Sequence, residues 1–174
     1  MKQILLLYQS HTGFTRRYAQ WIGEELGIPP ISLRDCTRDR IREADMIIFG
    51  GSVRGSVISG RAKVERLCRK AGGKSVLWFG VGLRPNTPRT MELLRKNNFP
   101  GASPALFYLR GGMAPEGLTP GDRTLVTCYR AMMKRQSRPD PEDWELLSLL
   151  AVPCDCAGPE QIQPLIQAVK ERLV

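Results

Sequence analysis

The chain has 174 residues, of which 42% are hydrophobic and 25% are charged, and its formal net charge is +9. These values fit a single compact domain and exclude wholesale disorder. No apolar run approaches the ~20 residues that a membrane-spanning helix needs, and the run at residues 4–8 is too short for a signal peptide. We therefore expect a cytoplasmic protein.

The excess of positive charge suggests three classes of partner, which are nucleic acid, a membrane surface and acidic proteins. The basic residues are scattered along the chain, without a basic tail or a recognisable nucleic-acid module, so we predict no nucleic-acid binding. Most of them are typical of solvated helix faces.

The five cysteines are an odd number at irregular spacing, which is not the pattern of a disulfide framework. Cys154 and Cys156 form the only close pair. No second cluster completes a metal site, so we interpret this pair as two reduced thiols and predict no metal.

Short apolar runs alternate with helical patterns from the start of the chain. The first run, at residues 4–8, is continuously apolar, as expected for a strand that is covered on both faces. Apolar residues at helical spacing then predict a helix that starts near Phe14 and ends at Gly27. Further strands are predicted at residues 30–33, 45–50, 74–80 and 105–109. Between them we expect one helix over residues 64–71 and another that begins at Thr87 as N-cap, with Pro88 in its first turn.

The regular alternation of strands and helices ends after the fifth predicted strand. Residues 111–121 are rich in Gly and Pro and predict a loop. Two helices follow within residues 122–150, the second capped by Asp140, with Trp144 and Leu147 facing inward. An amphipathic helix over residues 162–173 ends the chain. We expect one α/β domain over residues 1–174, with 122–150 as a helical insertion before the last helix.

The loop after the first strand has the chemistry of a phosphate site. It reads Ser10-His11-Thr12-Gly13-Phe14-Thr15. Backbone N–H groups and the helix dipole favour an anion at a helix N-terminus, and the three hydroxyl groups can donate hydrogen bonds to phosphate oxygens. The alternative is an ordinary turn in which one hydroxyl caps the helix. His11 is interpreted as an exposed loop residue rather than a catalytic base, and Phe14 as a core residue that could also touch a ligand.

The pattern Ser10-x-Thr12-Gly13-x-Thr15 after an N-terminal strand is similar to the phosphate loop of flavodoxins, which bind flavin mononucleotide (FMN). The resemblance covers the whole chain and implies a flavodoxin-like three-layer sandwich, whose five-stranded parallel sheet has the order 2-1-3-4-5. A closer resemblance is to flavodoxin-domain proteins related to menaquinone-dependent protoporphyrinogen oxidase. It rests on the segment Phe107-Tyr108-Leu109-Arg110-Gly111-Gly112 and on the helical segment that follows.

The resemblance also implies that two further loops flank the flavin ring. We assign this role to Ser52, Val53, Arg54 and Gly55 after the third strand, and to Gly80, Val81, Gly82 and Leu83 after the fourth. The alternative is a pair of mobile glycine-rich loops without a ligand. Neither loop contains an aromatic residue, which leaves room beside the ring for a substrate or quinone.

Three arginines, Arg54, Arg84 and Arg110, are predicted at the carboxyl edge of the sheet. They could bind the carboxylates of a substrate, such as porphyrin propionates, by paired hydrogen bonds. They could equally stabilise the anionic reduced flavin, or simply be solvent-exposed loop residues.

Three functions remain open. The first is an FMN-dependent oxidoreductase that acts on a small anionic or quinone-like or porphyrinogen-like substrate, with no catalytic side chain because the flavin carries the chemistry. The second is an electron carrier between protein partners, and the third is a cofactor-free binding module.

The apolar side chains of residues 122–150 also have two interpretations. We expect them to pack on the sheet edge beside the fifth strand. The alternative is a surface for peripheral contact with the inner face of a membrane or for a homodimer, supported by basic residues at positions 130, 134, 135 and 138.

Overall fold

The computed structural model describes residues 2–136, 140–150 and 152–173. Five parallel strands follow the predicted order of 2-1-3-4-5. In sheet order they are β2 (Pro30–Ser32), β1 (Ile4–Gln9), β3 (Met46–Arg54), β5 (Ser75–Gly82) and β6 (Leu106–Arg110). The sheet differs from the prediction by a sixth strand, β4 (Val57–Ile58), which is antiparallel to β3.

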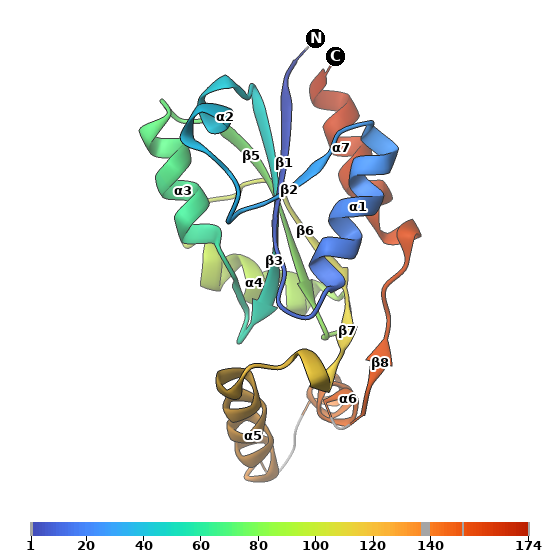
Figure 1. Ribbon diagram of the computed structural model, residues 1–174. Helices are drawn as coiled ribbons and strands as arrows, with labels where there is room; N and C mark the ends of the chain where they lie inside the picture. The colour runs from blue at the N-terminus through green and yellow to red at the C-terminus, as the bar shows by residue number, and fades with distance from the viewer. Residues whose placement is uncertain (1, 137–139, 151, 174) are drawn as a thin grey trace.

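Helices cover both faces of this sheet, as Figure 1 shows. One face carries α1 (Phe14–Leu26) and α7 (Gln163–Leu173), the latter preceded by the short helix η2 (Pro159–Ile162). The other face carries α3 (Arg61–Lys70) and α4 (Pro88–Asn98), together with α2 (Arg38–Glu43), which was not predicted. The three-layer flavodoxin-like sandwich is confirmed.

Strand residues alternate between two hydrophobic cores. Leu7 packs with Phe49 and Trp78 on the side of α3 and α4, whereas Leu6 packs with Tyr18 of α1 on the side of α1 and α7. Because successive strand side chains point to opposite faces, a strand buried on both faces must be apolar at every position. This explains the continuous apolar runs in the sequence.

Strands β3 and β5 extend further than predicted, through residues that we had assigned to loops beside the flavin ring. Their pairing continues to Ser52 opposite Val81. Beyond that point β3 turns through Gly55 and Ser56, whose φ angles are 55° and 65°, and pairs back with itself as β4. Two successive positive φ angles are typical of a tight two-residue hairpin. These residues therefore form a strand and a hairpin, and not the mobile glycine-rich loop that was the alternative to a flavin-binding loop.

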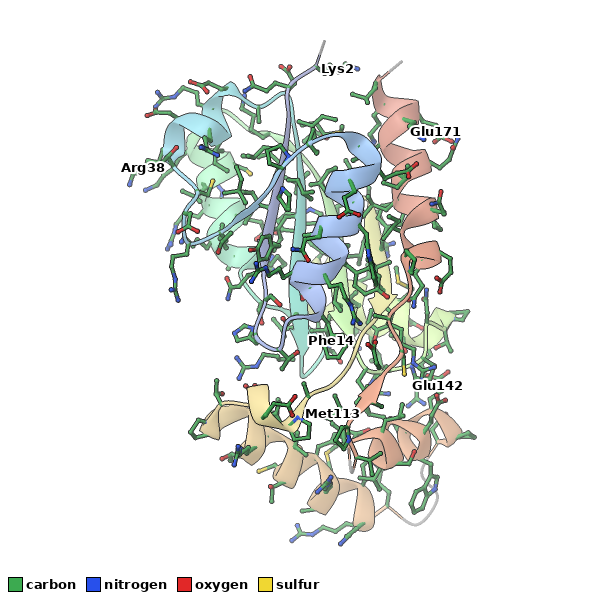
Figure 2. The ribbon with its side chains drawn as sticks, turned by 45° about the vertical axis from the view of Figure 1, so that its right-hand side comes forward. Lys2, Phe14, Arg38, Met113, Glu142 and Glu171 are labelled. Carbon is green, nitrogen blue, oxygen red and sulfur yellow. The ribbon has the colours of Figure 1, made fainter. Side chains whose placement is uncertain are left out.

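The insertion lies across the carboxyl ends of the strands, at the lower end in Figure 1, and not beside the last strand as expected. An antiparallel ribbon of β7 (Gly112–Met113) and β8 (Cys154–Asp155) leads into and out of it. Between these strands come the short helix η1 (Pro115–Gly117), α5 (Pro120–Lys134) and α6 (Pro141–Leu149). We call α5 and α6 the cap. Figure 2 shows Phe14 and Met113 at the cap end of the sheet, and Lys2 and Glu171 at the opposite end.

Side chains of the cap differ in part from the prediction. Asp140 caps α6 as expected, but Trp144 faces outward and is 56% exposed, while Leu146 is buried in its place. Leu125 and Met132 of α5 are also about half exposed. Arg138, one of the basic residues predicted to support a membrane or dimer surface, lies outside the described residues. Cys154 and Cys156 are free thiols.

No helix in the described ranges has both the length and the apolar composition to cross a membrane.

Candidate functional site

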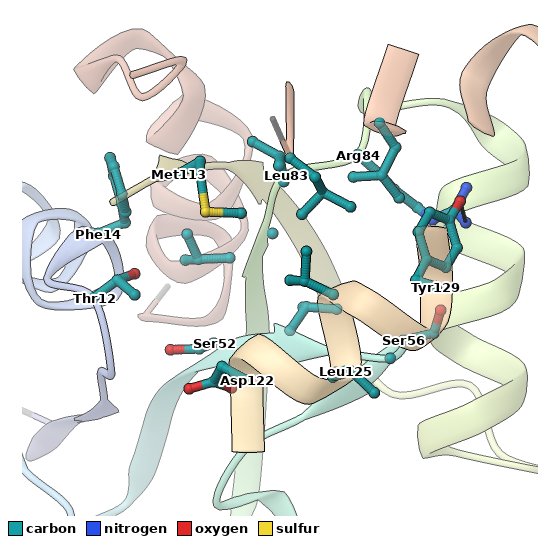
Figure 3. A pocket seen from close by; sticks show the side chains of 18 of the residues that line it. Thr12, Phe14, Ser52, Ser56, Leu83, Arg84, Met113, Asp122, Leu125 and Tyr129 are labelled. Carbon is teal, nitrogen blue, oxygen red and sulfur yellow. Dashed lines mark hydrogen bonds between the residues drawn. The ribbon is translucent and has the colours of Figure 1, made fainter. Parts of the chain in front are cut away.

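A cavity of about 590 Å³ lies between the carboxyl edge of the sheet and the cap, as Figure 3 shows. This volume is within the range of about 300–1,000 Å³ typical of small-molecule sites. The loop after β1, the β3–β4 hairpin and the end of β5 contribute predicted site residues to its wall. These are Thr12, Phe14, Thr15, Ser52, Val53, Gly55, Val81, Gly82, Leu83 and Arg84.

Helix α1 begins without a side-chain cap. Its N-cap is Gly13, whose φ of 94° is left-handed, and no side chain bonds to the first turn. The hydroxyl oxygen of Ser10 instead accepts a hydrogen bond from the N–H of Gly13 at 3.1 Å. The first-turn N–H groups therefore remain directed at the loop, where an anion is favoured. This geometry is not that of the capping turn considered as the alternative.

Ser52 joins the phosphate loop to the sheet. Its hydroxyl oxygen accepts a hydrogen bond from the N–H of His11 at 3.3 Å and lies 3.2 Å from the hydroxyl of Thr15, which is 1% exposed. The same hydroxyl donates to the carbonyl of Gln9 at 3.4 Å. Ser52, assigned from sequence to the flavin ring, thus lies against the phosphate loop, and His11 is turned toward it at 3.4 Å.

A buried asparagine of α4 holds the β3–β4 hairpin in place, and the sequence analysis missed it. The side chain of Asn98, 1% exposed, accepts from the N–H of Ile58 at 2.8 Å and donates to the carbonyl of Ser56 at 2.9 Å. A side-chain amide that satisfies both an N–H and a carbonyl group substitutes for a missing strand partner. The hairpin therefore has a fixed position at the cavity wall.

We expect Asn98→Ala to lower the free energy of unfolding by about 2–3 kcal/mol, because it leaves buried backbone groups of the hairpin unpaired. Urea unfolding measures this loss. The neighbouring Asn97 is exposed, so Asn97→Ala is the matched control and should change stability by less than about 0.5 kcal/mol. Equal stability of the two variants would contradict the role given to Asn98.

At the end of β5, glycine makes room for an aromatic side chain. A Cβ atom on Gly82 would lie 2.7 Å from the hydroxyl oxygen of Tyr108. That hydroxyl donates to the carbonyl of Arg84 at 3.0 Å, and Asn86 donates to the carbonyl of Tyr108 at 3.1 Å. The loop after β5 is thereby tied to β6, with Leu83 and Arg84 in the cavity wall.

The three arginines predicted as substrate ligands each pair with a carboxylate of the cap. Arg54 pairs with Asp122 of α5, and Arg110 pairs with Glu145 of α6. Arg84 lies 2.8 Å from Asp143 of α6. The arginines therefore join the sheet edge to the cap, a role that no sequence spacing could indicate.

These contacts shift the acidity of the two buried carboxyl groups. Burial alone would raise the pKa of Asp122, but hydrogen bonds from Thr119 and the charge of Arg54 hold it below its ordinary value. Burial likewise opposes the shift of Asp143, and its contacts with Arg84 and Tyr129 lower its pKa. Both groups are thus carboxylates at neutral pH.

Six predicted residues do not line the cavity. Ser10, His11 and Gly13 belong to the loop after β1 without being part of the cavity wall, and Arg54 and Arg110 pair with carboxylates of the cap. A Cβ atom on Gly80 would meet Val53 at 2.8 Å, so this glycine serves packing and not ligand contact. No sequence pattern indicated the residues that line the part of the cavity next to the cap. Those include Met113, Leu118, Asp122, Leu125, Tyr129 and Met132.

A phosphate-type loop at the carboxyl edge of a parallel sheet is the arrangement of α/β proteins that bind phosphate-bearing ligands. A family model described as a flavodoxin domain matches residues 5–140. The chain belongs to the flavodoxin domain family.

Solved structures similar to this chain include three that are described as flavodoxins. A flavodoxin from the domain Archaea is 21% identical, with 87% of this chain and 97% of that chain covered and a TM-score of 0.43. The two-electron reduced flavodoxin of Megasphaera elsdenii is 19% identical, with 86% and 98% covered and a TM-score of 0.47. A WrbA-like flavodoxin from Agrobacterium tumefaciens is 16% identical, with 87% and 95% covered and a TM-score of 0.43. A comparison with curated protein sequences gave no match.

Proposed function

We propose that the protein binds FMN at the carboxyl edge of the sheet and passes electrons between it and a small-molecule substrate. Membership of the flavodoxin family supports the cofactor. The residues suited to its phosphate are Ser10, Thr12 and Thr15, together with the first-turn N–H groups of α1. The residues suited to its ring are those of the hairpin and the end of β5, among them Val53, Gly55, Gly82 and Leu83.

The residues present fit this cofactor in two respects. A dianionic phosphate would satisfy the uncapped first turn of α1, where Gly13 permits close approach of the backbone. The cavity beside this loop is apolar over most of its wall, as a flat aromatic ring requires. When bound, the flavin supplies one- or two-electron transfer. The side chains of this protein bind it, orient it and exclude water from it.

The single observation that favours a small-molecule substrate over a protein partner is the cap. It covers the carboxyl edge of the sheet with α5 and α6 and leaves a cavity that extends past the phosphate loop, to Leu118, Leu125 and Met132. A protein partner would need an open edge, whereas a small quinone-like molecule suits an enclosed cavity. A relation to the protoporphyrinogen oxidase branch is part of this proposal, supported by residues 107–112 and by the position of the cap.

Contact with a membrane surface or with a second copy of the chain also stays a prediction. The half-exposed side chains of Leu125, Met132 and Trp144 support it, because apolar side chains gathered at one end of a molecule are common at contact surfaces.

The test combines calorimetry with spectroscopy. FMN is titrated into flavin-free protein, and we expect saturable binding at one site per chain. The photoreduced FMN-loaded protein is then mixed anaerobically with menadione or with cytochrome c. The return of the absorbance of oxidised flavin at about 450 nm is followed. We expect menadione to reoxidise it faster. Absence of FMN binding would refute the redox function, and faster reaction with cytochrome c would support an electron carrier.

A further inference from the structure

The cavity wall carries two charged side chains among the described residues, Arg84 and Asp122. Each is paired with a residue of opposite charge that does not line the cavity. Arg84 pairs with Asp143, and Asp122 pairs with Arg54. In both pairs the arginine belongs to the sheet edge and the carboxylate to the cap. In the first pair the arginine lines the cavity, whereas in the second pair the carboxylate lines it.

The pair at Arg84 is the more enclosed of the two. The side chain of Arg84 is 19% exposed and that of Asp143 is 10% exposed. The hydroxyl of Tyr129 donates to Asp143 at 3.1 Å and accepts from Arg84 at 3.2 Å, which closes a three-membered network at the wall. A charge pair in such a place is weakly screened by solvent.

A second arginine helps to hold Asp143. Arg89 of α4 lies 3.4 Å from Asp143 and 2.7 Å from Asp140, so Asp143 is not its only partner. Removing the charge of Asp143 would therefore leave Arg89 paired with Asp140. Only Arg84 would then present an unneutralised charge to the cavity.

Apart from these charged and hydroxyl groups, the part of the cavity wall next to the cap is largely apolar. Leu93 of α4, Val126 and Met132 of α5 and Leu146 of α6 line it. An anionic ligand entering this space would lose its hydration, and it would find no cationic group that is not already neutralised. An uncharged ligand would lose little.

We propose that Asp143 determines the charge selectivity of this cavity: by neutralising Arg84 it makes the space under α5 and α6 select uncharged ligands over anionic ones. This deepens the proposed function, on which it rests, by naming the charge class of the substrate. Asp143 acts through Arg84 and is a positioning residue. The pairing with Asp143 explains why Arg84, which was predicted to bind a substrate carboxylate, would not do so.

The test measures ligand binding apart from turnover. Menadione, which is uncharged, and 1,2-naphthoquinone-4-sulfonate, which is anionic, are added by equilibrium dialysis to the oxidised FMN-loaded protein. We expect the unchanged protein to bind menadione at least about tenfold more tightly than the sulfonate. In Asp143→Asn the amide keeps a hydrogen-bond acceptor for Arg84 and Tyr129, and we expect sulfonate affinity to rise about tenfold while menadione affinity stays the same.

Two further variants make the result specific. In the double variant Arg84→Met with Asp143→Asn, the gain in sulfonate affinity should vanish, because the unneutralised charge is gone. Asp39→Asn is the matched control, since Asp39 is exposed and pairs with Arg42 on α2, away from the cavity. This variant should retain the original preference.

The proposal and the proposed function can fail separately. Equal affinity of the unchanged protein for the two quinones, or a gain that persists in the double variant, would overturn the selectivity proposal even when FMN binds. If FMN does not bind, the redox function is wrong. Dialysis of the sulfonate against flavin-free Asp143→Asn and against the flavin-free double variant then measures the effect of Arg84 alone, because both variants share the same phosphate loop. Circular dichroism and the melting temperature show whether Asp143→Asn is folded. If this variant does not fold, the quinone preferences of the unchanged protein and of Arg84→Met test the proposal. Loss of menadione preference in Arg84→Met would also refute the proposal.

Discussion

Replacing Thr12 by Asp is expected to weaken FMN binding by at least about 100-fold. Thr12 lies in the loop before α1 and lines the cavity, so a carboxylate there would face the phosphate that the loop is proposed to bind. Two like charges about 4 Å apart repel by ~4 kcal/mol at an effective dielectric constant of about 20, and each 1.4 kcal/mol is a factor of about ten in affinity. Titration calorimetry with FMN measures the loss.

Two control variants separate charge from other effects. Thr12→Val removes the hydroxyl without adding charge and should cost only about tenfold, the worth of one hydrogen bond to a charged group. Thr37→Asp adds the same charge at the exposed N-cap of α2, on the other end of the molecule. Because Asp and Thr are both good N-caps, this variant should fold and bind FMN normally. Undiminished FMN affinity in Thr12→Asp would place the phosphate elsewhere.

The second large effect is expected from Gly50→Ala, in the middle of the sheet. Gly50 of β3 is paired with Phe79 of β5, and a Cβ atom on it would lie 1.9 Å from Cζ of the fully buried Phe79 ring. Because the ring is fully buried and the contact would be far too short, the ring or the strands must shift. We expect the free energy of unfolding to fall by about 3 kcal/mol and the melting temperature to fall by about 10 °C.

The control for this change is the same substitution at a helical glycine with open surroundings. A Cβ atom on Gly121 of α5 would approach nothing closer than 3.8 Å. Gly121→Ala should therefore leave the melting temperature unchanged or raise it slightly, because alanine favours helix. A loss of similar size in both variants would show that the Gly50 contact is not the cause. Differential scanning calorimetry measures both.

The site was predicted in part from local patterns. Ser10, Thr12, Gly13 and Thr15 are neighbours in the chain, and the strand and helix on either side of them have clear periodicity. A loop between a buried strand and an amphipathic helix is confined by both of its ends. Its position at the sheet edge therefore followed from the sequence without any knowledge of distant contacts.

Local sequence patterns could not predict the structure of the glycine-rich stretch after the third predicted strand. Glycine permits flexible loops and close packing alike, and the sequence does not say which. At Gly50 the deciding partner is Phe79, and at the hairpin it is Asn98, which lies on a helix much later in the chain. Only the assembled sheet brings these groups together.

The sequence by itself determined the parallel sheet, the helices on both faces and the hydroxyl-rich loop, because strand and helix periodicity and helix caps are properties of neighbouring residues. The order of the strands was implied by the resemblance to flavodoxins. The tertiary structure alone decided where α5 and α6 lie and what the arginines do. Exposed helices with several polar faces can pack in many places, and the choice here depends on pairs such as Arg84 with Asp143 and Arg54 with Asp122. Such pairs form between segments whose separation along the chain carries no signal, so they emerge only when the fold brings opposite charges into contact.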